Sequence, residues 1–345
     1  MTTQLHSIQI TEEQDRRAVE LHARAVVFDC SSVVKEEPEH FERAKVGGVT
    51  GTNHTVTHPH SDFSQATIDM GRCAAWIKEN PEHGLLATTV ADIRGAKETG
   101  REAIVFGPQN SEFIGVDLNR LDVAYALGMR IMQLTYQRQN WVGSGCGEPH
   151  DGGISMFGKT LIKEMDEMGI VIDLSHCGPL TSLEGMEFSS NPAIFTHAHP
   201  YSPTPHIRAK ADDVLKALAD QGGVIGITAL SAFLADPVNK KQRPGLEAFM
   251  KHVTYVAELV GVDHVGIGLD FDETNTPEKF AADKARHPEL DLGFGWDDKR
   301  IFDLIDSSHE LNVTRALVMA GFDDDEILKI LGENFLRVFG QVWGE

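Results

Sequence analysis

The amino-acid sequence predicts an α/β protein of the (β/α)8 TIM-barrel class. Short apolar runs rich in β-branched residues alternate with helical stretches along most of the 345 residues, which is typical of βα units in a parallel sheet. Eight such runs occur, and eight parallel strands close a barrel. No internal repeat or Pro/Ser-rich linker interrupts the alternation. We therefore expect one domain over residues 1–345, with an N-terminal helical extension and C-terminal helices.

The expected strands span residues 25–30, 48–54, 103–107, 129–134, 169–174, 193–196, 223–228 and 264–269. Between them, residues 156–168 and 212–219 place apolar side chains at i, i+3, i+4 and i+7, so we expect these helices to coat the barrel. A helical C-terminus should pack Phe335, Val338 and Trp343 against it.

The charge of the chain excludes two classes of partner. The sequence has 31 Lys and Arg against 52 Asp and Glu, a net charge of −21, so its surface repels phosphate backbones and anionic headgroups. We expect a small-molecule substrate, with neither nucleic acid nor membrane as a partner.

The N-terminus lacks the basic start and apolar segment of a secretory signal, and no run of about 18 apolar residues occurs. The four cysteines lie far apart without a CxxC pair, which fits a reducing compartment. These features predict a cytoplasmic protein. Any metal site would have to rely on histidine and carboxylate.

Polar residues at the ends of the predicted strands indicate where chemistry would take place. The longest irregular stretches, 137–153 and 271–296, both follow strand ends, at the face where barrel active sites are built. His176 and His197 end neighbouring strands and could share one metal ion, with Asp270 reaching in from across the mouth. The alternative is that they are hydrogen-bonded loop residues without a metal.

Arg208 follows a proline-rich loop beyond the sixth strand. Its guanidinium could clamp a substrate carboxylate in bidentate fashion. The alternative is an ordinary surface ion pair.

Several of these segments together resemble the renal (membrane) dipeptidase family of zinc peptidases in the amidohydrolase superfamily. They are the run that ends at Tyr136, the Asp-Leu-Ser-His run that ends at His176, the His197 strand, Arg208, the Val-Gly-Ile-Gly-Leu-Asp-Phe-Asp run of residues 265–272, and the Gly-Glu-Asn-Phe-Leu-Arg run of residues 332–337. The resemblance extends from about residue 25 to the C-terminus. It implies a metal-dependent hydrolase barrel, a pair of bridged zinc ions and hydrolysis of dipeptides.

The chain departs from the family pattern at one of the two metal positions. Where the family has a His-x-Asp pair after strand one, this chain has Ser31 and Val33, and where strand three should supply a bridging glutamate it has Gln109. Serine is a poor zinc ligand, valine is none, and a neutral glutamine cannot balance two adjacent dications. The family's strand-four histidine is matched by Tyr136, which can still donate a hydrogen bond. We therefore expect at most one zinc per chain.

Two functions remain open at this point. The first is a dipeptidase-like metallohydrolase acting on a small amide or dipeptide with a free carboxylate. His176 and His197 would hold the zinc, Asp270 would act as the general base, Arg208 would bind the carboxylate, and Tyr136 would stabilise the oxyanion.

The second function is a metal-free barrel that binds a small metabolite or performs non-hydrolytic acid/base chemistry, with Gln109, Ser31 and Tyr136 as a hydrogen-bonding pocket. A rewired metal site that uses Cys30, His54 or Cys177 is a further alternative. Relatives commonly form dimers, so a homodimer is also open.

Overall fold

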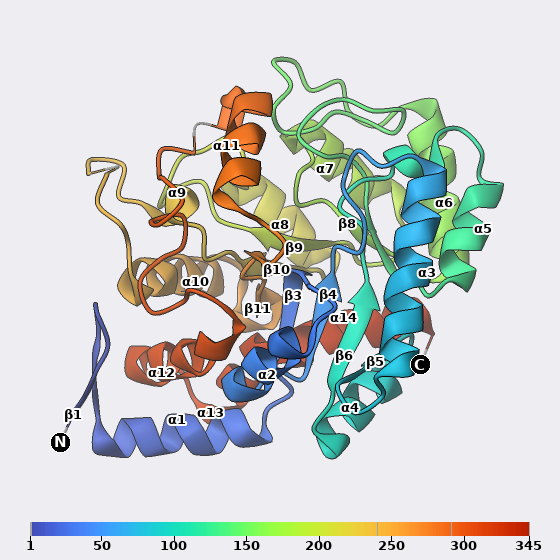
Figure 1. Cartoon of the computed structure of the whole chain (residues 1–345). Helices are drawn as coiled ribbons and strands as arrows, with labels where there is room; N and C mark the ends of the chain where they lie inside the picture. The colour runs from blue at the N-terminus through green and yellow to red at the C-terminus, as the bar shows by residue number, and fades with distance from the viewer. Residues whose placement is uncertain (1, 240, 291, 345) are drawn as a thin grey trace.

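The computed structural model describes residues 2–239, 241–290 and 292–344 (Figure 1). All eight predicted apolar runs contain strands of one barrel wall. These strands are β3 (Phe28–Val33), β4 (Gly51–His54), β6 (Glu102–Phe106), β7 (Ile131–Gln133), β8 (Val171–Asp173), β9 (Ile194–Ala198), β10 (Val224–Ile227) and β11 (Val265–Ile267). The fold is the predicted α/β barrel of parallel strands.

Two parallel sheets make up the wall, with strand orders β11-β10-β9-β8-β7 and β12-β3-β4-β6-β5. On one side they meet where Phe106, at the end of β6, bridges Met129 just before β7. On the other side β12 (Phe271–Asp272) follows β11 along the chain and pairs with β3. The last strand is thus brought back beside the first. Strand β5 (Gly84–Leu86) is an addition next to β6.

Helices surround these strands (Figure 1). They are α1 (Glu12–Arg24), α2 (Pro38–Gly47), α3 (Phe63–Glu79), α4 (Val90–Thr99), α5 (Asn119–Ala126), α6 (Met156–Met168), α7 (Pro179–Phe188), α8 (Asp212–Asp220), α9 (Ser231–Leu234), α10 (Leu246–Val260), α11 (Pro277–Arg286), α12 (Leu311–Ala320), α13 (Asp324–Leu328) and α14 (Asn334–Trp343). A small antiparallel hairpin, β1 (Thr2–Gln4) and β2 (Gln9–Thr11), precedes α1. No helix in the described part of the chain is long and apolar enough to cross a membrane.

Helix α6 shows how local sequence sets the boundaries of an element. The Ser155 hydroxyl accepts a hydrogen bond from the Gly158 amide and caps the first turn, and Gly169 ends the helix in a left-handed conformation with φ of 72°. The predicted helix 156–168 therefore has the observed bounds.

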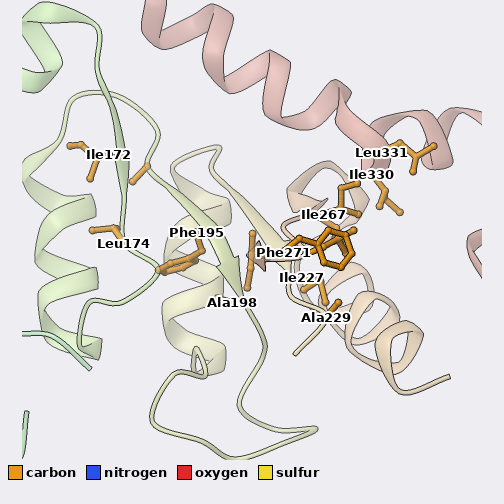
Figure 2. Packing of buried hydrophobic residues seen from close by; sticks show 14 of the residues in the cluster. Ile172, Leu174, Phe195, Ala198, Ile227, Ala229, Ile267, Phe271, Ile330 and Leu331 are labelled. Atoms are coloured by element: carbon orange, nitrogen blue, oxygen red, sulfur yellow. The ribbon is translucent and has the colours of Figure 1, made fainter. Parts of the chain in front are cut away.

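Successive strand side chains point to opposite sides of the barrel wall and therefore contribute to two different apolar clusters. One apolar cluster joins strand residues such as Phe28, Val105 and Val171 to α14, where the Phe28 and Phe339 rings meet edge to face at 5.3 Å. Phe335 and Val338 of α14 are buried in this cluster and Trp343 packs against it. The intervening strand residues belong to a second cluster under the helices, part of which Figure 2 shows.

One expectation from the sequence needs correction. Residues 271–296 were expected to be irregular, but they contain β12 and α11. Helix α11 has an N-cap, Thr276, whose hydroxyl accepts from the Lys279 amide, and a proline in its first turn. None of its residues is buried, so the apolar periodicity that reveals other helices is missing here.

Candidate active site

The C-terminal ends of the strands surround a cavity of about 440 Å³. Five of the six predicted site residues line it: Gln109, Tyr136, His176, Arg208 and Asp270. The sixth, His197, contacts His176 through the two Nε2 atoms, which lie 2.8 Å apart. The structure thus brings the predicted residues together at one place.

The two histidines are held as neutral rings. Burial lowers the pKa of both His176 and His197 well below the ordinary value, and the nearby Arg208 charge lowers it further. Neutral imidazole is the form that binds a metal ion.

A hydrogen-bonded chain fixes the orientation of His197. The Thr196 hydroxyl donates to Asp173 Oδ2 at 2.7 Å, so its oxygen is left to accept the Nδ1 proton of His197 at 2.8 Å. The Nε2 lone pair of His197 is therefore directed at His176. A partner on the far nitrogen is the usual support of a metal-binding histidine.

This arrangement fits a zinc ion. The two Nε2 atoms share a hydrogen bond in which His176 donates to the His197 lone pair. A zinc ion would take the place of the shared proton when that proton moves to His176 Nδ1, and the His176 ring lines the cavity from which a further ligand could come. His176 Nδ1 is buried without a hydrogen-bond partner among the described residues, so its orientation relies on packing against Tyr136 instead.

We predict that Thr196→Val lowers zinc affinity by about 10- to 100-fold, the usual cost of losing the outer partner of a metal-binding histidine. Competition with a chelator measures this affinity. Thr228→Val is the matched control, because the Thr228 hydroxyl is buried with no hydrogen-bond partner among the residues that the structure describes and should not influence zinc. Equal affinities in the two variants would contradict the role of Thr196.

Ser31 and Gln109, which the sequence analysis expects at the second metal position, hydrogen-bond to each other. The Ser31 hydroxyl donates to Asp270 Oδ1 at 3.3 Å, and Gln109 Nε2 donates to Ser31 Oγ at 3.4 Å and to Thr55 Oγ1 at 2.9 Å. Asp270 contributes the one carboxylate of this network. Burial raises the pKa of Asp270, while Arg300 and Arg208 oppose that shift.

The backbone of Asp270 adopts a left-handed conformation with φ of 60°, which aspartate tolerates better than most residues. Arg300 donates from Nη1 to the Leu269 carbonyl at 2.9 Å and from Nη2 to the Asp270 carbonyl. The Asp270 amide donates to the Ser31 carbonyl at 2.9 Å. These contacts hold the turn that directs the Asp270 side chain.

Arg208 is 1% exposed and is therefore not a surface ion pair. Its Nη1 donates to the Ser175 carbonyl, and its Nη2 donates to the His197 carbonyl at 3.2 Å. A guanidinium has five N–H donors, so further donors remain beyond those that serve these two carbonyls. Because Arg208 also lines the cavity, it can support the histidine strands and still face a ligand.

The Tyr136 ring stacks on His176 with centroids 4.4 Å apart. His60 and His287 contact the same ring edge to face, at 5.7 and 5.9 Å. Burial and the Asp270 charge raise the pKa of Tyr136, so its hydroxyl keeps its proton. It can act as a hydrogen-bond donor.

Sequence reasoning missed several cavity residues. They are Glu36, His58, His60, Asp272, His287, Lys299 and Arg300. The His-Pro-His segment of residues 58–60 follows the second strand, and its place past a strand end was a usable signal. Arg300 and Lys299 lie far from any strand end, so no sequence signal indicated them.

Comparisons with known proteins agree with this architecture. The sequence profile of the membrane dipeptidases (peptidase family M19) matches residues 39–291. An amidohydrolase from Pseudomonas aeruginosa is 33% identical, with a TM-score of 0.87 over 95% of this chain and 99% of that one.

Two more distant structures share the fold. The probable dipeptidase PvdM from Pseudomonas aeruginosa is 22% identical, with a TM-score of 0.80 over 96% of this chain and 99% of that one. A metallo peptidase from Rhodobacter sphaeroides, liganded with a phosphinate mimic of L-Ala-D-Ala, is 20% identical, with a TM-score of 0.78 over 92% and 99%.

Proposed function

Because the chain belongs to the membrane dipeptidase family, whose members are metal-dependent peptidases, we propose that it hydrolyses a small amide or dipeptide with a free carboxylate, with at most one zinc ion at the strand ends. One observation carries this proposal. His176 and His197 keep facing nitrogens and a supporting hydrogen-bond chain, whereas Ser31 and Gln109 form a neutral network at the other metal position.

Different residues would supply the metal site, the general base and the oxyanion donor. When bound by His176 and His197, zinc would supply polarisation of the scissile carbonyl and activation of the attacking water. Asp270 is placed to accept a proton at its carboxylate, and Tyr136 to donate a hydrogen bond to the developing oxyanion.

Two further groups would bind the ends of the substrate. Arg208 has N–H donors left for the substrate carboxylate. Both amide protons of Gln109 are donated to Ser31 and Thr55, which leaves Oε1 to accept a hydrogen bond from a substrate amine.

Arg208→Lys should raise KM by about tenfold, the equivalent of roughly 1.4 kcal/mol of binding, because a point charge cannot reproduce the planar fork. We also expect a loss of stability, since a lysine has one nitrogen where the guanidinium sets two against the Ser175 and His197 carbonyls. Steady-state kinetics and urea unfolding separate the two effects. Arg337→Lys is the control, because Arg337 also donates to two carbonyls, those of Gly222 and Asp263, away from the cavity. An unchanged KM in Arg208→Lys would place Arg208 outside the substrate site.

The metal content tests the reduced site. A bridged pair of dications needs several anionic ligands, and Val33 and Gln109 stand where the family has two of them. We expect the wild type to exceed the double variant His176→Ala/His197→Ala by at most one zinc per chain in elemental analysis. The variant Ser31→His/Val33→Asp/Gln109→Glu, which restores the family pattern, should bind one more ion than the wild type. Two bridged metals at these strand ends in the wild type would overturn the proposal.

A metal-free function is the second candidate, and the Asp270–Ser31–Gln109–Thr55 network is the observation that favours it. The Ser31 hydroxyl and both Gln109 amide protons are donated within this network, which leaves Gln109 Oε1 to accept a hydrogen bond from a ligand. Full activity of the His176→Ala/His197→Ala variant would select this candidate.

A further inference from the structure

Three side chains of metal-binding type converge beside strand β4, apart from the two histidines described above. Glu36 lies in the loop after β3, His54 ends β4, and Cys73 lies on α3. One ligand atom from each lies within 4.8 Å of the other two. Glu36 and His54 line the active-site cavity, but none of the three has a role in the proposed hydrolysis.

His54 is the best indication that this cluster has a ligand. It is 2% exposed, and its Nε2 atom has no hydrogen-bond partner among the described residues. A buried polar atom without a partner costs free energy, about 1–3 kcal/mol, which a bound group would recover. Burial lowers the pKa of His54 to about 3, so the ring is neutral and can act as a ligand.

The hydrogen bond at Nδ1 determines which tautomer the His54 ring adopts. The Val34 amide donates to Nδ1 at 3.0 Å, and a backbone hydrogen bond with Ser32 raises the pKa of the ring against burial. With the Val34 amide donating to Nδ1, the neutral ring carries its proton on Nε2, where it has no acceptor among the described residues. A divalent ion would bind at Nε2 when this proton moves to Nδ1 and the Val34 hydrogen bond is given up.

Cys73 and Glu36 would supply anionic ligands. Burial and the Glu36 charge raise the pKa of the Cys73 thiol, so without a cation it remains protonated and is a poor nucleophile. A divalent ion would displace the thiol proton and bring the thiolate and carboxylate to one centre. The nearby Arg72 charge opposes binding, but Arg72 is paired with Asp69 at 3.5 Å.

The cluster also has an entry path. Glu36 and His54 both line the cavity of about 440 Å³ that His176 lines. An ion and a water ligand could reach the cluster from there. A thiolate, an imidazole and a carboxylate, with water in the fourth position, are the ligands that four-coordinate zinc prefers.

We propose that Glu36, His54 and Cys73 form a second metal site for a single zinc-class divalent ion, separate from the one between His176 and His197. It ties the β3–α2 loop and helix α3 to the end of β4. A measured content of two metal ions per chain could then come from two separate sites and would not by itself indicate a bridged pair.

Cobalt(II) is the probe that reports a thiolate ligand directly. Wild-type protein, stripped of metal and titrated with Co²⁺, should develop a thiolate-to-cobalt charge-transfer absorption in the near ultraviolet. Cys73→Ser should lose this absorption, and His54→Gln should lower cobalt affinity at least tenfold. Cys30→Ala is the matched control, since Cys30 is equally buried but lies in the barrel interior among apolar side chains.

The outcomes separate this site from the active site. His176→Ala should keep the charge-transfer absorption, and Cys73→Ser should keep the metal that depends on His176. Glu36 is only half-buried, so Glu36→Gln should fold normally and still weaken binding. Absence of the absorption in the wild type, or its persistence in Cys73→Ser, would overturn the second site and leave the proposed hydrolase function untouched.

Discussion

His176→Ala should give a folded protein that loses zinc from the strand ends and loses hydrolysis by more than about 100-fold. Losing an outer partner of a metal ligand already costs roughly 10- to 100-fold, and a ligand itself contributes more. The same loss is expected for His197→Ala, because the two Nε2 atoms face each other at 2.8 Å and either one alone is a poor chelator.

The experiment needs a control for histidine loss in general. His150 is exposed and lies outside the cavity, so His150→Ala should retain both zinc and activity. Zinc content and specific activity on a panel of dipeptides are measured on the same preparations. If His176→Ala retains activity and the wild type contains no metal at the strand ends, the metal-free function is the correct one.

His40→Leu should destabilise the fold by about 3–5 kcal/mol, the cost of breaking a buried ion pair from one side. His40 on α2 is 2% exposed and sits between two carboxylates, with Nε2 3.0 Å from Glu102 and Nδ1 2.8 Å from Glu273. Arg43 still pairs with Glu273 in the variant, whereas the charge of Glu102 is left buried without a partner. Urea unfolding measures the loss.

The effect of His40 should depend on pH in a defined direction. Burial lowers its pKa, but the charges and hydrogen bonds of Glu102 and Glu273 outweigh burial and raise it from 6.5 to about 10. The stability that His40 contributes is then complete below pH 6.5 and is lost as the pH rises through about 10. The difference in the free energy of unfolding between wild type and His40→Leu should become smaller over that pH range.

A second substitution checks the cause of the loss. Glu102→Gln removes the charge that His40 neutralises, so the double variant His40→Leu/Glu102→Gln should be more stable than His40→Leu alone. A double variant that is less stable by the sum of the two single losses would show that packing, and not charge, explains the effect.

The sequence was sufficient for features that depend on neighbours along the chain. The barrel strands followed from apolar runs, and helix α6 from apolar side chains spaced at i, i+3, i+4 and i+7. Placing His176 and His197 together followed from the rule that parallel strands end at the same edge of a sheet. The expectation that Ser31 and Gln109 replace family ligands rests on residue identity alone and stays a prediction.

Only the tertiary structure determined the contacts between residues that are distant in sequence. Arg300 reaches the Asp270 carbonyl, His40 joins Glu102 to Glu273, and each contact depends on how a loop or helix packs against the sheet. No periodicity encodes such contacts, because they arise between surfaces whose relative placement is set by the whole core.

The Glu36, His54 and Cys73 cluster illustrates the same limit. His54 could be suspected as a ligand from its place at a strand end, but Cys73 occupies an ordinary apolar position of a helix and Glu36 an ordinary loop position. Their ligand atoms come within 4.8 Å because the tertiary structure brings α3, the end of β4 and the β3–α2 loop together. The sequence shows that these residues are of metal-binding types, but only the packing of the tertiary structure brings their ligand atoms close together.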